Sequence, residues 1–264
     1  MEASIVLDIM YLEIGEHGPI WPDTEKIAAG MELAARNGFK NVEFWDWNNV
    51  DYKALAKKKD ELGINVVSIC AKDRGFLADA AQHEKSVEGL KETISAAKVL
   101  GCKNIIITAM ELPDISSEES GRNVLEGLKK LTKEAEKEDV TLILEPLSGN
   151  MPPSYFKDSA KPFEMIREIG SDHLKLLYDI FHYQMMEGNI VNTIRDNLDK
   201  IGHIHMANTP ARNELTEGEL NYTYLIRSLK EMGYDKCIGL EFMPTKDRET
   251  AVKECYALIS DALK

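Results

Sequence analysis

The sequence predicts a single (β/α)8 barrel over residues 1–264, in which eight parallel strands alternate with helices. Three observations support this fold class. Short apolar runs alternate with longer amphipathic segments from one end of the chain to the other. Glycines stand where the helical segments should end. Eight units in 264 residues give 33 residues per unit, which fits a closed barrel better than an open sheet.

The short apolar runs predict eight strands. In chain order, they are Ser4–Asp8, Asn41–Phe44, Asn65–Cys70, Asn104–Thr108, Thr141–Glu145, Lys175–Asp179, Gly202–His205 and Cys237–Glu241. Strands that alternate with helices must run parallel, because each helix returns the chain to the edge from which it started. All strand carboxyl ends should therefore lie at one rim of the barrel, which is the rim that carries the chemistry in this fold.

The segments between these runs have helical periodicity. Apolar residues recur three and four positions apart, as in Val87, Leu90, Ile94 and Ala97, and in Val124, Leu128, Leu131 and Ala135. Glycine followed by an apolar residue marks the predicted helix ends at Gly38, Gly63, Gly101 and Gly233. A doubly wound open sheet is the alternative, but the sequence has neither a GxGxxG after the first strand nor a Walker loop.

Composition restricts the partners. A formal net charge of −13 argues against nucleic acid, because phosphate binding needs a basic face. The sequence contains no run of 18 apolar residues and no basic segment before the first apolar stretch, which argues against membrane spans and a signal peptide. The cysteines are scattered without a CxxC pair, as in reduced proteins of the cytoplasm. We therefore expect a cytoplasmic protein that acts on a small molecule.

Four side chains able to bind a metal end the last four predicted strands. They are Glu145, Asp179, His205 and Glu241. Acids often end strands as helix caps or ion-pair partners, and either explanation suffices for any one residue. Four such endings in succession favour a metal site at the rim. Three carboxylates and one imidazole suit one divalent ion such as Mn²⁺, Mg²⁺ or Co²⁺, and Zn²⁺ also fits this set.

Other residues near the predicted rim are candidates for substrate contacts. His182 and Arg212 follow the sixth and seventh strands, and Glu43 and Trp45 lie at the end of the second. Each has a simpler explanation: a loop histidine, a surface arginine, a carboxylate paired with a base, and a tryptophan packed against a helix. His203 shares a strand face with His205 but lies deeper, so it should support the site from below.

Several motifs resemble the hydroxypyruvate isomerase branch of the xylose isomerase-like TIM barrels. They are NGFKNVEFW, LGCKNIIITA, LILEPL, LLYDIFHYQMMEGNI, IGHIHMANTPARNE with GELNY, and GYDKCIGLEF. The resemblance implies that Glu145, Asp179, His205 and Glu241 hold the metal. It also implies that Glu145 and Glu241 are the acid–base pair, and that His182 and Arg212 contact the substrate. Relatives in this family are often dimers or tetramers.

The chain departs from that branch at three positions. His205 stands where the branch often has glutamine and where the sugar epimerases have histidine. Ser148 and Met151 replace an asparagine and an aspartate in the loop after the fifth strand. Because this loop borders the substrate, we expect another small hydroxycarbonyl to be turned over better than hydroxypyruvate.

The predicted activity is a metal-dependent isomerisation of a small α-hydroxycarbonyl compound. One glutamate would remove a proton to form an enediolate, and the other would return it to the neighbouring carbon. Return to the opposite face of the same carbon would make the protein a ketose 3-epimerase, which is the first alternative. A phosphodiesterase like endonuclease IV is a weaker alternative, because six histidines and a charge of −13 do not suit several zinc ions and a DNA surface. For a non-catalytic sugar-binding or inosose dehydratase-like protein the sequence offers no positive sign.

Overall fold

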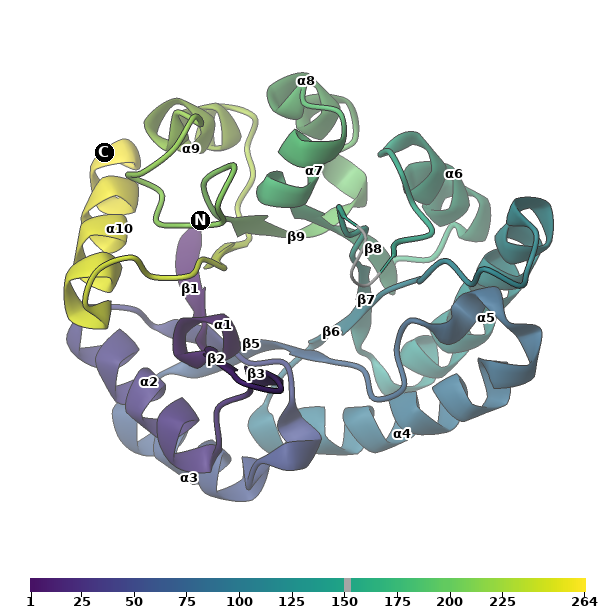
Figure 1. Cartoon of the computed structure of the whole chain (residues 1–264), viewed down its shortest axis with the longest axis horizontal. Coiled ribbons are helices and arrows are strands. Elements are labelled where there is room, and N and C mark those ends of the chain that lie inside the picture. The colour runs from purple at the N-terminus through teal and green to yellow at the C-terminus, as the bar shows by residue number, and fades with distance from the viewer. Residues whose placement is uncertain (150–152) are drawn as a thin grey trace. The chain divides into compact units, whose positions relative to one another are not determined.

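The computed structural model describes residues 1–149 and 153–264. In this part of the chain, eight parallel strands form a closed barrel in the order β1-β10-β9-β8-β7-β6-β5-β4 (Figure 1). The predicted (β/α)8 barrel is therefore confirmed. Of the residues singled out from the sequence, Met151 lies outside the described residues.

The strand bounds agree closely with the apolar runs. The barrel strands are β1 (Glu2–Val6), β4 (Asn41–Glu43), β5 (Asn65–Cys70), β6 (Asn104–Ile107), β7 (Thr141–Leu144), β8 (Leu174–Asp179), β9 (Ile201–Met206) and β10 (Cys237–Leu240). Seven of them begin and end within one residue of the predicted bounds. The exception is β1, which ends at Val6, so that Asp8 lies in the following helix instead of the strand.

The helices lie between the strands, as the periodicity predicts. They are α1 (Leu7–Tyr11), α2 (Thr24–Arg36), α3 (Tyr52–Leu62), α4 (His83–Leu100), α5 (Ser117–Glu138), α6 (Ala160–Ile169), α7 (Ile180–Met186), α8 (Ile190–Asp196), α9 (Tyr222–Glu231) and α10 (Arg248–Ala262). Asp51, Asn221 and Asp247 cap α3, α9 and α10 by accepting a backbone N–H from the first turn. Gly63 ends α3 in the left-handed conformation, with φ of 63°, as the sequence predicts.

The contacts group into two compact units. The first comprises Met1–Ile69, Val99–Cys102 and Ile204–Lys264, and the second comprises Cys70–Lys98 and Lys103–His203. In the first unit, β1 pairs with β4 and β10, and α9 packs against α10 (Figure 1). In the second, β7 pairs with β6 and β8, and α5 covers β7. A single domain over residues 1–264 stays a prediction.

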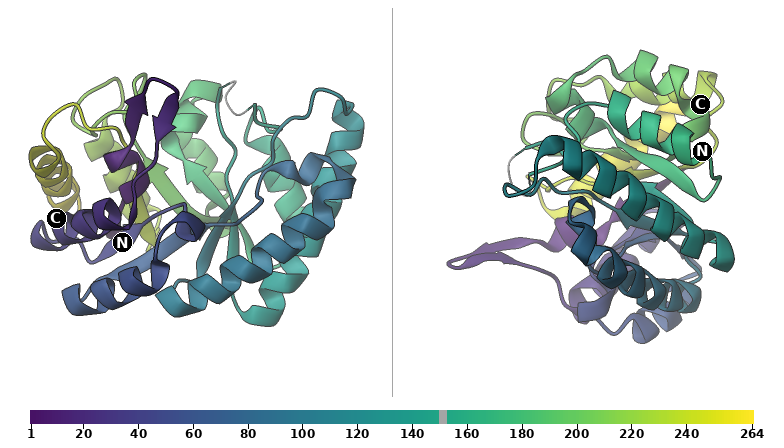
Figure 2. Two further views of the ribbon diagram at one scale, coloured as in Figure 1. Left: turned by 60° about the horizontal axis from the view of Figure 1, so that its bottom comes forward. Right: turned by 90° about the vertical axis from the view of Figure 1, so that its right-hand side faces the viewer.

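A short hairpin between α1 and α2 is absent from the sequence-based prediction. Its strands are β2 (Glu13–Gly15) and β3 (Gly18–Ile20), which pair antiparallel. Figure 2 shows it as an arm that extends away from β1 and α1. Strands of three residues are too short for the apolar periodicity to reveal them. Separately, no helix in the described residues is long and apolar enough to cross a membrane.

Candidate active site

The predicted site residues lie at the carboxyl ends of their strands. Glu43 and Asp179 are the last residues of β4 and β8, and His205 is the second-last residue of β9. Glu145 and Glu241 directly follow β7 and β10. All five side chains are buried. Buried carboxylates need partners that offset the loss of hydration, so their surroundings determine what they do.

The four predicted metal ligands form one group of potential donors. Each of Glu145, Asp179, His205 and Glu241 offers one ligand atom, and these atoms lie within 4.8 Å of one another. The donor set therefore consists of three carboxylate oxygens and one imidazole nitrogen. Hard or borderline divalent cations favour this combination.

In the first unit, His205 lies between two carboxylates. Its Nε2 is 3.1 Å from Oε2 of Glu43, and its Nδ1 is 3.1 Å from Oε2 of Glu241. Burial opposes the charge on the imidazole, but the two carboxylates outweigh this effect and hold the pKa of His205 well above its usual value. The ring is therefore fixed in orientation through both nitrogens.

Glu43 is held on both of its carboxylate oxygens. Ser4 Oγ donates a hydrogen bond of 2.5 Å to Oε1, and Ser68 Oγ donates to Oε2, which also faces His205. The side chain is 0% exposed. A carboxylate in this position orients the imidazole and fixes which nitrogen faces Glu241. Its predicted contact with a substrate stays a prediction.

Arg212 contacts Glu241 from the loop after β9. Its Nη2 lies 2.7 Å from Oε2 of Glu241, the oxygen that also faces His205. The arginine side chain is 20% exposed, whereas that of Glu241 is 2% exposed. The arginine side chain is thus partly accessible, whereas the carboxylate that it contacts is buried. The predicted contact of Arg212 with a substrate stays a prediction.

In the second unit, His182 is bound by Ser148 and faces Asp179. The backbone N–H of Ser148 donates to Nδ1 of His182 at 3.0 Å, and Ser148 Oγ lies 2.8 Å from the same nitrogen. Because a backbone N–H can only donate, Nδ1 must accept, and the proton of a neutral ring is on Nε2. That nitrogen lies 3.4 Å from Oδ2 of Asp179.

Asp179 has a second role in the local fold. Its Oδ1 accepts from the backbone N–H of Phe181 at 2.8 Å and so caps α7. The other oxygen, Oδ2, is the one that faces His182. The helix-cap explanation considered from the sequence is therefore correct for this residue, whose two oxygens face different groups.

The tryptophans that follow β4 differ in environment. Trp47 is buried and packs edge-on against Tyr52, which makes it a core residue. Trp45 is half-buried, and its ring centroid lies 5.7 Å from that of Trp21, which follows the β2–β3 hairpin. Trp45 is therefore the more exposed of the two, and its predicted contact with a substrate stays a prediction.

Asp8 is a buried carboxylate to which the sequence analysis assigned no role. Its oxygens accept from the backbone N–H groups of Trp45 at 2.7 Å and of Asp46 at 3.4 Å. Burial raises its pKa to about 7, against the lowering effect of these hydrogen bonds. Asp8 follows the first apolar run much as Glu145 follows the fifth, so the same signal was available for it.

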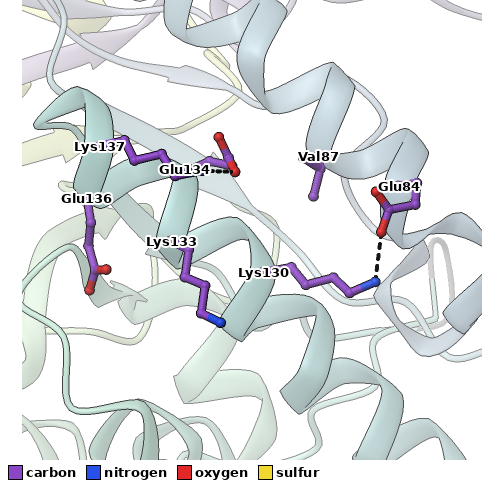
Figure 3. A pocket seen from close by; sticks show the side chains of 7 residues that line it. All are labelled: Glu84, Val87, Lys130, Lys133, Glu134, Glu136 and Lys137. Atoms are coloured by element: carbon purple, nitrogen blue, oxygen red, sulfur yellow. Dashed lines mark hydrogen bonds and ion pairs between the residues drawn. The ribbon is translucent and has the colours of Figure 1, made fainter.

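Two further features lie outside the group of four predicted metal ligands. His203 is buried, as expected for a supporting histidine. A surface groove of about 570 Å³ lies between α4 and α5 (Figure 3). Its charges pair with one another, Lys130 with Glu84 and Lys137 with Glu134. Exposed pairs of this kind contribute little to binding or stability.

The family model for the xylose isomerase-like TIM barrel matches residues 31–260. Among curated proteins, the hydroxypyruvate isomerase of Escherichia coli K12 is 31% identical over 234 residues, which cover 85% of this chain and 91% of the relative. The 2-oxo-tetronate isomerase of Haemophilus influenzae is 29% identical over 235 residues, covering 84% and 90%.

Solved structures have the same fold. An L-ribulose 3-epimerase superposes with a TM-score of 0.80 at 21% identity, covering 100% of this chain and 95% of that one. The IOLI protein, solved with a bound zinc atom, superposes with a TM-score of 0.75 at 16% identity, covering 99% and 96%. At these identities, the likeness establishes the barrel alone. The family model and the E. coli relative, taken with the strand-end residues above, assign this chain to the xylose isomerase-like TIM barrel family as an isomerase of a small substrate.

Proposed function

We propose that the protein is a metal-dependent isomerase of a small α-hydroxycarbonyl acid, with one divalent cation held by Glu145, Asp179, His205 and Glu241. The observation that carries this proposal is the buried group of three carboxylates and one imidazole with ligand atoms within 4.8 Å of one another. Carboxylates this close repel each other when charged, and a divalent cation would remove that repulsion. The donor set therefore fits the ion, and Mn²⁺, Mg²⁺ or Co²⁺ matches it best.

The proposed chemistry divides between the cation and the two glutamates. When bound, the cation supplies Lewis-acid stabilisation of negative charge on the substrate oxygens. One of Glu145 and Glu241 takes the proton from the hydroxyl-bearing carbon, and the other delivers a proton to the carbonyl carbon, while the hydroxyl proton passes to the former carbonyl oxygen. Arg212 and His205 both face Oε2 of Glu241, so a positive guanidinium and an imidazole favour the carboxylate form of this residue.

The proposed substrate class follows from Arg212. Its planar guanidinium is suited to a carboxylate, and the side chain is partly accessible. The names of two relatives support an acid as substrate, because hydroxypyruvate and 2-oxo-tetronate are both hydroxy-oxo acids. In this proposal His182, with its proton on Nε2, donates to a substrate oxygen, and Trp45 forms an apolar wall.

Epimerisation of a ketose on the same residues is the second candidate. His205 favours it, since the sugar epimerases have histidine at this position. The two activities differ in where the proton returns: to the neighbouring carbon in an isomerase and to the same carbon in an epimerase. Product analysis by NMR distinguishes them, because only the first changes the position of the carbonyl group.

The test is a substrate screen with added Mn²⁺, Mg²⁺ or Co²⁺. It should include 3-hydroxy-2-oxo acids, short aldoses and ketoses, each incubated in D₂O. We expect an acid to be converted to its carbonyl isomer, with solvent deuterium in the product. Products free of deuterium would contradict proton exchange through the glutamates, and conversion of ketoses alone, without movement of the carbonyl, would identify the epimerase instead.

A further inference from the structure

Two loops of the first unit are joined by three consecutive residues. The loop after β9 carries Arg212, whose backbone oxygen accepts from Met243 N at 2.8 Å. Asn213 Nδ2 donates to the backbone oxygen of Met243 at 3.0 Å, and the carboxylate of Glu214 accepts from Thr245 N at 2.7 Å. Met243 and Thr245 belong to the loop after β10, which begins with Glu241. The loop that carries Arg212 is thus tied to the loop that carries its partner.

Glu214 makes most of this connection. Its side chain is 0% exposed. Besides Thr245 N, it accepts from Thr245 Oγ1 at 3.0 Å and from Lys246 N at 3.3 Å. The ammonium group of Lys246 points elsewhere, to Glu217 and Glu254. Backbone amides and a hydroxyl therefore solvate this buried carboxylate, an arrangement that depends on the two loops keeping their relative positions.

Arg212 itself has a backbone conformation that needs support. Its φ of 59° lies in the left-handed region, which is unfavourable for a residue with a side chain. Such a conformation persists where the surrounding contacts hold it. Because Arg212 stands two residues before Glu214, the carboxylate fixes the chain just beyond the strained position. The direction of the guanidinium, 2.7 Å from Glu241, depends on that backbone.

We propose that Glu214 is a positioning residue, which holds the loop after β9 so that Arg212 reaches Glu241 and the acid group of the substrate. This inference rests on the proposed function, in which Arg212 binds that acid group. Glu214 does not touch the substrate in this scheme. Its effect on turnover passes through Arg212, so it should be lost when Arg212 is replaced.

The kinetic test is a double-mutant cycle on the full chain with saturating Mn²⁺. Glu214→Gln should lower kcat/KM for the acid about 10- to 100-fold, mainly by raising KM, because small misplacements of a binding group cost that much. In the Arg212→Ala background, the same change should cost less than about twofold. Glu217→Gln is the matched control. It removes an exposed carboxylate from the same loop, whose ion pair with Lys246 is exposed to solvent and contributes little, so KM should stay unchanged.

A second variant covers the case in which Glu214→Gln does not fold. Thr245→Val removes only the hydroxyl donor and should lower kcat/KM about two- to tenfold, the usual effect of one neutral hydrogen bond. Equal losses for Glu214→Gln with and without Arg212, or no loss in either background, would overturn the positioning role.

A measurement without substrate separates this inference from the proposed function. In NMR spectra, the Nε–H signal of Arg212 should shift and broaden in Glu214→Gln but not in Glu217→Gln. An unchanged signal in both variants would overturn the positioning role even if the enzyme is active. If the wild type converts none of the acids while the signal shifts only in Glu214→Gln, that result would support the positioning role of Glu214 and contradict the proposed substrate class.

Discussion

Three buried glutamates in the first unit show how the surroundings assign different tasks to one side chain. Glu43 is bound by two serine hydroxyls and His205, Glu241 faces Arg212 and His205, and Glu214 is bound by Thr245 and a backbone amide. Of these three glutamates, only Glu241 lies beside a partly accessible positive side chain, that of Arg212. Proton transfer requires contact with a substrate, so Glu241 is the member of this set suited to it.

The first prediction concerns the proposed acid–base pair. Glu145→Gln and Glu241→Gln keep the size of the side chain but remove the proton acceptor. Each change should lower kcat by a factor of about 10²–10⁴, the usual contribution of general acid–base catalysis. Rates should be measured at saturating metal, because both residues are also proposed ligands. Glu231→Gln, on the exposed face of α9, is the control and should retain full activity. Loss of less than tenfold in both variants would remove these glutamates from the mechanism.

A second prediction follows from the pKa of Asp8, which burial raises to about 7. At pH values between the ordinary pKa of an aspartate and about 7, the Asp8 carboxyl group is protonated in the folded state but not in the unfolded state. Stability from this group is therefore present at low pH and decreases as pH rises towards 7. Relative to Asp8→Asn, the wild type should lose roughly 2 kcal/mol of unfolding free energy between pH 5.5 and 8.

Denaturant unfolding of both proteins across this range measures that difference. Asp114→Asn, which changes an exposed aspartate, is the control and should follow the wild type. A difference between wild type and Asp8→Asn that does not vary with pH would mean that Asp8 is charged throughout, held by the backbone N–H groups of Trp45 and Asp46.

At the scale of elements, the loops after the strands determine specificity on a common barrel. The loop after β7 contacts α7 through Ser148 and His182, and the loop after β9 contacts the loop after β10 through Glu214. Each connection joins a loop to its neighbour within one unit. We therefore expect a substitution in one loop to change the position of a side chain carried by another element.

The third prediction concerns the loop after β7. Ser148 replaces the asparagine of the hydroxypyruvate isomerase branch, and its N–H and hydroxyl bind His182. We expect hydroxypyruvate to have a lower kcat/KM than another small hydroxycarbonyl compound, and Ser148→Asn to raise the value for hydroxypyruvate. A broad substrate screen with both proteins measures this. If hydroxypyruvate is the best substrate of the wild type, the loop does not set the preference.

For the whole molecule, the fourth prediction is that metal binding increases the stability of the folded chain. A cation that binds the folded chain alone stabilises it, by about 2.7 kcal/mol at a hundred times its Kd. Chelation should abolish activity and lower Tm by about 5–10 °C, and Mn²⁺ or Co²⁺ should restore both. In Asp179→Asn, added metal should raise Tm by less. Full activity after exhaustive chelation, with no metal by elemental analysis, would exclude the proposed cofactor.

The sequence patterns were sufficient to predict the barrel and the position of each predicted site residue along its strand. The apolar runs end near Glu145, Asp179, His205 and Glu241, and a parallel barrel brings all strand carboxyl ends to one rim. The same pattern misplaced the end of β1 and left Asp8 without a role. Periodicity does not distinguish the last residue of a strand from the first turn of a helix when both are buried.

Tertiary structure alone decided which side chains touch. Ser148 binds His182, Ser4 and Ser68 bind Glu43, and Glu214 binds Thr245, over separations of 25 to 39 residues. Local periodicity depends on neighbours a few positions away, so it determines secondary structure and the face on which a residue lies. Hydrogen bonds across loops depend on distances of about 3 Å between distant parts of the chain, which only the packed fold sets.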